Sequence, residues 1–126
     1  MMQLATFKID WDVLQQLREE HLKLIGQVSR RRPVDRGRIY DLDASFHEII
    51  ATFSGNAFLI QAIQKQNRLR RLIEYGGYTR LERVKTWAKE HLAILDALQR
   101  EQFERAAECM RCHLTNAMHA TQGLQP

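Results

Sequence analysis

The sequence predicts an all-α protein, an antiparallel helical bundle that forms one domain over residues 1–126. Apolar residues recur three or four positions apart along nearly the whole chain, which is the spacing of one face of a helix. Only two prolines and six glycines occur, so long helices can run without interruption. Short connections between long amphipathic helices favour antiparallel neighbours.

Capping and turn residues limit five predicted helices, which cover residues 10–28, 36–53, 57–75, 79–99 and 102–119. Asp10 and Asp35 are candidate N-caps of the first and second helices. Glycine-containing turns end the second and third helices. The first helix is predicted to bury an apolar face formed by Leu14, Leu17, Leu22 and Ile25.

Four polar residues fall on the buried faces of these helices. On the second helix, Asp43 and His47 lie one turn apart on the stripe that also carries Phe46. On the fourth and fifth helices, the apolar stripes pass through His91 and His113. An isolated buried carboxylate or imidazolium is costly, so four such groups on core faces need a common explanation.

A metal ion explains this set if the four side chains meet at one level of the bundle. The turn near residues 101–102 is about eleven residues from both His91 and His113, so an antiparallel helix pair places them at one height. Three imidazoles and a carboxylate then form a site for one transition-metal ion. For any single residue, a hydrogen-bonded core histidine or a buried ion pair is the alternative. We interpret His21 and His119 as surface histidines.

Other patterns in the sequence are weaker. The string Cys109-Met110-Arg111-Cys112-His113 matches the haem-attachment pattern, but haem is attached after export and the first residues are not a signal peptide. The spacing excludes Glu-x-x-His di-iron pairs and the His-Glu-x-x-His zinc-protease motif. The formal charge of +4 comes from scattered basic residues, and the run Arg30-Arg31-Arg32 lies in a predicted solvated loop.

The sequence also bears on the compartment. No apolar run approaches the roughly 20 residues that a membrane span needs. The apolar stretch at the start is too short for a signal peptide and soon reaches a charged residue. We therefore expect a cytoplasmic protein with no membrane partner, whose two cysteines are reduced.

Several short strings occur together in an order that is typical of one family. They are Asp43-Ala44-Ser45-Phe46-His47, then Ser54-Gly55-Asn56, then Glu90-His91 with residues 92–98, then Ala106 and His113-Leu114. With these strings, residues 10–118 resemble the FCD domain, the C-terminal effector-sensing domain of FadR-subfamily, GntR-type transcription regulators.

The resemblance implies a bundle in which one aspartate and three histidines hold one divalent metal ion, most often zinc or nickel. Asp43, His47, His91 and His113 occupy the matching positions, and all four are present. The family further implies a small carboxylic acid effector that binds open positions of the ion, a homodimer, and no enzymatic activity.

Two residues of the third predicted helix are candidate effector contacts. Gln66 and Arg70 share a stripe with Ile63, and an arginine in the same cavity would complete the recognition of a carboxylate. An arginine whose stem covers apolar surface while its head stays in water is the alternative for Arg70.

The chain departs from the family in two respects. We expect it to lack both the winged-helix domain and the family's first sensing-domain helix, so DNA would be contacted only through a domain absent from this chain. Glu101-Gln102 replaces the frequent Gly-Asp between the last two helices, and glutamine is a poorer N-cap, so we expect a differently built turn.

Two other functions remain open from the sequence. One is a structural or dimerisation module whose metal ion only adds stability. The other is a metal-dependent enzyme, since a metal ion with open positions can activate water. The enzyme would need a general base beside the ion, and no inward-facing carboxylate is left unassigned.

Overall fold

The computed structural model describes residues 9–53, 55, 57–70 and 81–123, and these residues form helices without any strand. The helices are α1 (Trp11–Ser29), α2 (Arg36–Phe53), α3 (Ala57–Arg70), α4 (Leu81–Gln99) and α5 (Phe103–Gly123). The predicted all-α class is therefore confirmed. The expected extension of the third helix to residue 75 and the expected start of the fourth at residue 79 lie outside the described residues.

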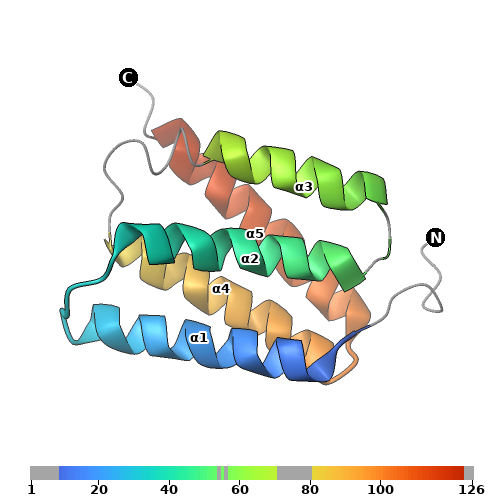
Figure 1. The fold of residues 1–126 in the computed structure, drawn as a ribbon, viewed down its shortest axis with the longest axis horizontal. Helices are drawn as coiled ribbons and strands as arrows, with labels where there is room; N and C mark the ends of the chain where they lie inside the picture. Colours follow the sequence, from blue (N-terminus) through green and yellow to red (C-terminus); the bar gives the residue numbers. More distant parts are fainter. Residues whose placement is uncertain (1–8, 54, 56, 71–80, 124–126) are drawn as a thin grey trace.

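Successive helices run in opposite directions, so the bundle is antiparallel (Figure 1). The most extensive packing joins α4 to α5 and α1 to α4, whereas α2 lies against α1 and α4. Helix α3 packs mainly on the outer side of α2 and forms the edge of the bundle in Figure 1. This arrangement places the inner faces of α2, α4 and α5 around one central region.

Side-chain caps begin the first two helices as predicted. The Asp10 carboxylate accepts hydrogen bonds from the backbone N–H groups of Asp12 and Val13. The Asp35 carboxylate accepts one from the backbone N–H of Gly37 at 2.8 Å. Such caps satisfy amide groups that have no partner within the helix, which fixes where each helix begins.

The turn between α4 and α5 has the hydrogen bonds of a Schellman motif. The backbone N–H of Glu101 donates to the Leu98 carbonyl, and that of Gln102 donates to the Ala97 carbonyl. Glu101 has a φ of 56°, a left-handed conformation that glycine adopts more readily. The turn thus differs from the family's frequent Gly-Asp turn in that a glutamate occupies the left-handed position that glycine usually takes.

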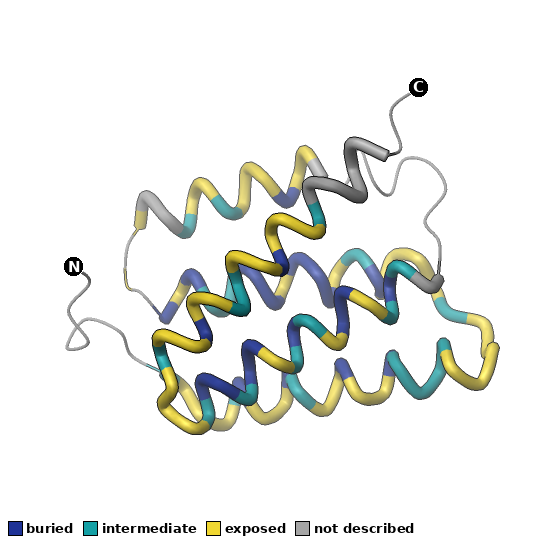
Figure 2. Tube along the Cα trace, turned by 180° about the vertical axis from the view of Figure 1, so that it is seen from behind, coloured by how far each residue is buried: buried dark blue, intermediate teal, exposed yellow. Residues whose placement is uncertain are grey.

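The hydrophobic core lies along the inward faces of the helices (Figure 2). The face that α1 buries differs from the predicted one. Leu22 is 50% exposed, so its assignment to the buried face was wrong, whereas His21 and Leu24 are buried beside the predicted Leu14 and Leu17. The physical reason is that residues 14, 17, 21 and 24 form one continuous stripe toward α4, and Leu22 lies about 100° from His21.

Candidate metal centre

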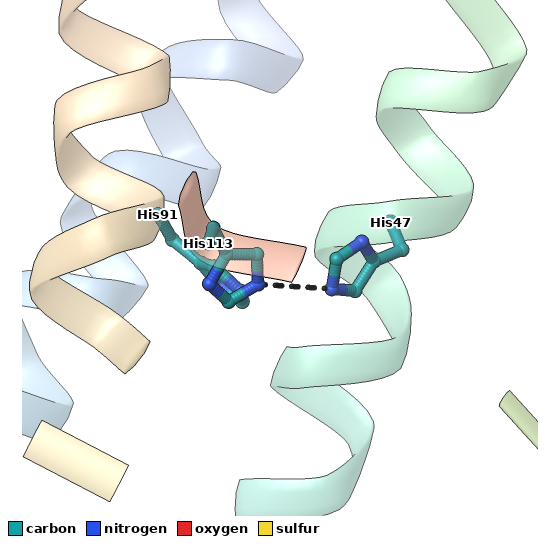
Figure 3. Close-up of side chains that lie close together, drawn as sticks. All are labelled: His47, His91 and His113. Atoms are coloured by element: carbon teal, nitrogen blue, oxygen red, sulfur yellow. Dashed lines mark hydrogen bonds between the residues drawn. The ribbon is translucent and has the colours of Figure 1, made fainter. Parts of the chain in front are cut away.

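The four predicted ligands come from three helices and are all buried. Helix α2 supplies Asp43 and His47, α4 supplies His91, and α5 supplies His113. Their exposed fractions range from 0% to 6%. Figure 3 shows the imidazoles of His47, His91 and His113 converging, with a ring nitrogen of His47 facing His113.

The distances within this group are those of ligand atoms around a single ion. His91 Nε2 lies 3.0 Å from His113 Nε2, and His113 Nε2 lies 3.4 Å from His47 Nε2. The Asp43 Oδ1 atom is 3.5 Å from His47 Nε2 and 3.6 Å from His91 Nε2. Bonds of about 2.0–2.1 Å to zinc place neighbouring donors about 3.0–3.4 Å apart. The three histidines can therefore hold a metal ion, and the Asp43 carboxylate lies beside them.

Hydrogen bonds to a second histidine set the tautomer of His91. The Leu17 carbonyl can only accept, so His21 Nδ1 carries a proton and donates it at 2.7 Å. In a neutral His21 ring, Nε2 is then an acceptor, and it receives the Nδ1–H of His91 at 2.8 Å. The neutral His91 ring consequently has an unprotonated Nε2, which is the form that binds a metal ion.

The Glu90 carboxylate sets the tautomer of His113. His113 Nδ1 donates to Glu90 Oε1 at 2.7 Å, and the Asn116 amide donates to the other carboxylate oxygen. Burial lowers the pKa of His113, and likewise that of His21, below the ordinary imidazole value of 6.5. Both rings are therefore neutral near neutral pH, and the Nε2 of His113 is unprotonated.

These two hydrogen-bond networks leave a specific electrostatic problem at the centre. The Nε2 atoms of His91 and His113 lie 3.0 Å apart, and each network has already placed its proton on the opposite nitrogen. With both rings neutral in these tautomers and no ion between them, two lone pairs would face one another in a buried site, which is unfavourable. A cation between them would turn this repulsion into two coordinate bonds.

Aromatic rings hold His91 in place. The Phe46 ring stacks on the His91 imidazole with centroids 3.7 Å apart and planes inclined by 7°. Trp87 contacts the same imidazole at a centroid distance of 5.0 Å. Phe46 is fully buried and Trp87 nearly so. These rings restrict rotation of the His91 imidazole and exclude water from one side of the centre.

Sequence reasoning missed the partners of the predicted ligands. His21 is fully buried and bonded to His91, so its interpretation as a surface histidine was wrong. The side chain of His119 lies outside the described residues. Glu90 is mostly covered and bonded to His113, and Glu48 accepts from the Asn67 amide at 3.2 Å. Adjacency to a ligand in sequence was the available signal for Glu90.

The candidate effector contacts lie on α3. Gln66 is exposed, and the side chain of Arg70 lies outside the described residues, so a role for either stays a prediction. Among the α3 side chains that the structure describes, the buried polar one is Asn67, whose amide also donates to the Ala44 carbonyl of α2. Asn67 thereby fixes α3 to the helix that carries Asp43.

The Cys-x-x-Cys-His string lies within α5, as expected, and only its histidine joins the centre. Cys109 is partly buried and Cys112 is exposed, and both are free thiols. The Cys112 thiol faces the Glu108 carboxylate at 4.0 Å on the outer side of the helix. The two cysteines therefore do not contribute to the histidine cluster.

The bundle and its centre together define an all-helical domain built around a buried, histidine-rich site that can hold a metal ion. Comparison with protein families sharpens this class: the FCD domain family matches residues 1–116, and the chain belongs to that family. FCD domains are the effector-binding domains of GntR-type transcription regulators, and they regulate rather than catalyse. The comparisons with curated proteins and with solved structures found no match. Among the described residues, no helix is long and apolar enough to cross a membrane.

Proposed function

We propose that this chain is a metal-dependent effector-binding domain in which Asp43, His47, His91 and His113 hold one divalent ion, zinc or nickel. The observation that carries the proposal is the convergence of three buried imidazoles, in which His113 Nε2 lies 3.0 Å from His91 Nε2 and 3.4 Å from His47 Nε2. A cation would explain such a buried cluster, and the nearby Asp43 carboxylate supplies the anionic ligand that such an ion favours.

The effector is proposed to be a small carboxylic acid. Three neutral imidazoles and one carboxylate leave a divalent ion with one net positive charge in a buried site. Such a centre favours an anionic partner. If the ion takes six ligands, the four protein ligands would leave two positions for the two oxygens of a carboxylate. A tetrahedral ion would instead be closed by the four protein ligands and would be structural.

The regulator is proposed to act as a homodimer in the cytoplasm, and a winged-helix domain outside this chain would contact DNA. Gln66 and Arg70 remain the proposed contacts for the rest of the effector. Alanine variants at these two positions should weaken acid binding without changing metal content. An unchanged affinity in both variants would remove α3 from the effector site.

The metal content of purified protein tests the ligand set. Wild-type protein prepared without chelators should contain one equivalent of metal by elemental analysis. His91→Ala and His113→Ala should lose it. Asp43→Ala should also lower the metal content. Asp41→Ala is its matched control and should retain the metal, because Asp41 lies on the same helix but is exposed. Retention of a full equivalent in both histidine variants, with helical content unchanged by circular dichroism, would disprove the site.

A thermal-shift screen of small organic acids, with and without metal, tests the effector. An acid present at about 100 times its Kd should add about 2.7 kcal/mol to the free energy of unfolding. The shift should vanish when the metal is removed. Stabilisation by metal with no response to any acid would favour the alternative, a structural or dimerisation module whose ion only adds stability.

A further inference from the structure

We infer that His21 is a positioning residue for the metal centre, which fixes the tautomer and orientation of His91 from helix α1. The expected effect of His21 on metal affinity rests on the proposed metal site. The hydrogen-bond relay itself is a property of the metal-free protein. The relay runs from the Leu17 carbonyl through His21 to His91, with contacts of 2.7 Å and 2.8 Å.

The surroundings of His21 make a purely structural role a poor explanation. The residue is fully buried on the stripe of Leu17 and Leu24, where an apolar side chain would pack without any polar cost. Its ring lies edge-on to Phe46 at 5.7 Å and to Trp87 at 6.3 Å. A buried imidazole in such an environment must have both nitrogens satisfied, and here one partner is the backbone and the other is a candidate ligand.

The direction of the relay follows from the chemistry of its first member. A carbonyl oxygen has no proton to give, so the proton between Leu17 and His21 belongs to His21 Nδ1. His21 Nε2 can then accept only, which requires the proton of the next hydrogen bond to belong to His91 Nδ1. This tautomer leaves the lone pair of His91 Nε2 directed at the cluster, where His113 Nε2 lies 3.0 Å away.

The two relays at the centre use different acceptors. His113 donates to a carboxylate, Glu90, whereas His91 donates to a neutral imidazole, His21. A carboxylate acceptor raises the basicity of a ligating histidine more than a neutral acceptor does. The two ligating histidines therefore differ. The Glu90 carboxylate makes the His113 imidazole more basic, whereas His21 orients the His91 imidazole without adding a charge. The loss of a hydrogen-bond partner of a ligating histidine typically lowers metal affinity by about 10- to 100-fold.

The experiment compares three variants of α1 in the full chain. His21→Leu removes the acceptor and keeps the position apolar, while His21→Gln restores an oxygen that can accept the His91 proton. Leu24→Ala is the matched control, because it removes a buried side chain from the same face of α1 that cannot accept a hydrogen bond. Circular dichroism establishes that each variant is folded.

Nitrogen NMR of the histidine rings in the metal-free protein tests the relay directly. In the wild type, His21, His91 and His113 should all carry their proton on Nδ1. In His21→Leu, His91 should lose this tautomer while His113 keeps it, because Glu90 is unchanged. The relay is overturned if His21 carries its proton on Nε2, or if His91 keeps its tautomer in His21→Leu.

Zinc affinity, measured by competition with a chromophoric chelator, tests the consequence for the centre. His21→Leu should bind zinc about 10- to 100-fold more weakly than the wild type. His21→Gln should recover most of this loss, and Leu24→Ala should show little change. An equal loss in His21→Leu and Leu24→Ala would overturn the positioning role. If the wild type binds neither zinc nor nickel, the proposed function fails, and the NMR result still decides the relay.

Discussion

Acidification of the metal-free protein should destabilise it through His21 and His113. Burial lowers the pKa of both groups, so they stay neutral in the folded state at pH values where they are charged in the unfolded chain. The unfolded chain therefore binds more protons as the pH falls below the ordinary value of 6.5. The free energy of unfolding must decrease in that range.

The magnitude follows from the ordinary pKa. Between about pH 7.5 and about pH 5.5, a histidine that is charged only when unfolded lowers the free energy of unfolding by up to about 1.4 kcal/mol. His21 and His113 together thus contribute a loss of up to about 2.8 kcal/mol, a large part of the typical stability of about 5–15 kcal/mol. In His21→Leu one of these groups is gone, so the loss should be smaller by up to about 1.4 kcal/mol.

Urea unfolding in the presence of a chelator, at both pH values, measures this difference. The comparison uses the change with pH, so any constant effect of the substitution on stability cancels. Leu24→Ala should lower stability but leave the change with pH as in the wild type. Equal pH dependence in the wild type and His21→Leu would refute the assignment of His21 as a buried neutral imidazole.

Three other substitutions test separate parts of the structure. Glu101→Gly should raise the free energy of unfolding by about 0.5–1 kcal/mol in thermal melts, because glycine adopts the left-handed φ of 56° without strain. Glu104→Gly within α5 should lower it by about 1 kcal/mol, and a loss of stability in both would contradict the turn geometry. Asp43→Asn should weaken zinc binding by roughly tenfold or more in the chelator competition, whereas Asp41→Asn should not; equal affinities would exclude Asp43 as a ligand. Asn67→Ala should speed hydrogen exchange of α3 amides roughly 5- to 30-fold relative to the exposed-site control Gln66→Ala, because it removes the bonds to the Ala44 carbonyl and to Glu48. Unchanged exchange would show that other contacts hold α3.

Periodicity predicted the helices and the inward direction of the proposed ligands because both depend on local geometry. Asp43 and His47 needed only the four-residue spacing of one helix. The prediction that His91 and His113 lie at one level of the bundle needed one further assumption, that α4 and α5 are antiparallel around a short turn. Their Nε2 atoms indeed lie 3.0 Å apart. Glu101 in a left-handed conformation was not predictable in this way, because the strain is offset by packing and hydrogen bonds that local spacing does not describe.

His21 shows why the surroundings of the centre could not be predicted from local patterns. Helix α1 offers two overlapping apolar stripes, one through Leu22 and one through Leu24, and local spacing alone favours the stripe without a histidine. In the structure the other stripe is buried, and the imidazole of His21 on it is hydrogen-bonded to His91 of α4. The cost of burying the imidazole is thus offset by a residue seventy positions away. If the relay holds, a histidine on a buried stripe can indicate a partner of a metal ligand as well as a ligand, and only packing between helices distinguishes the two.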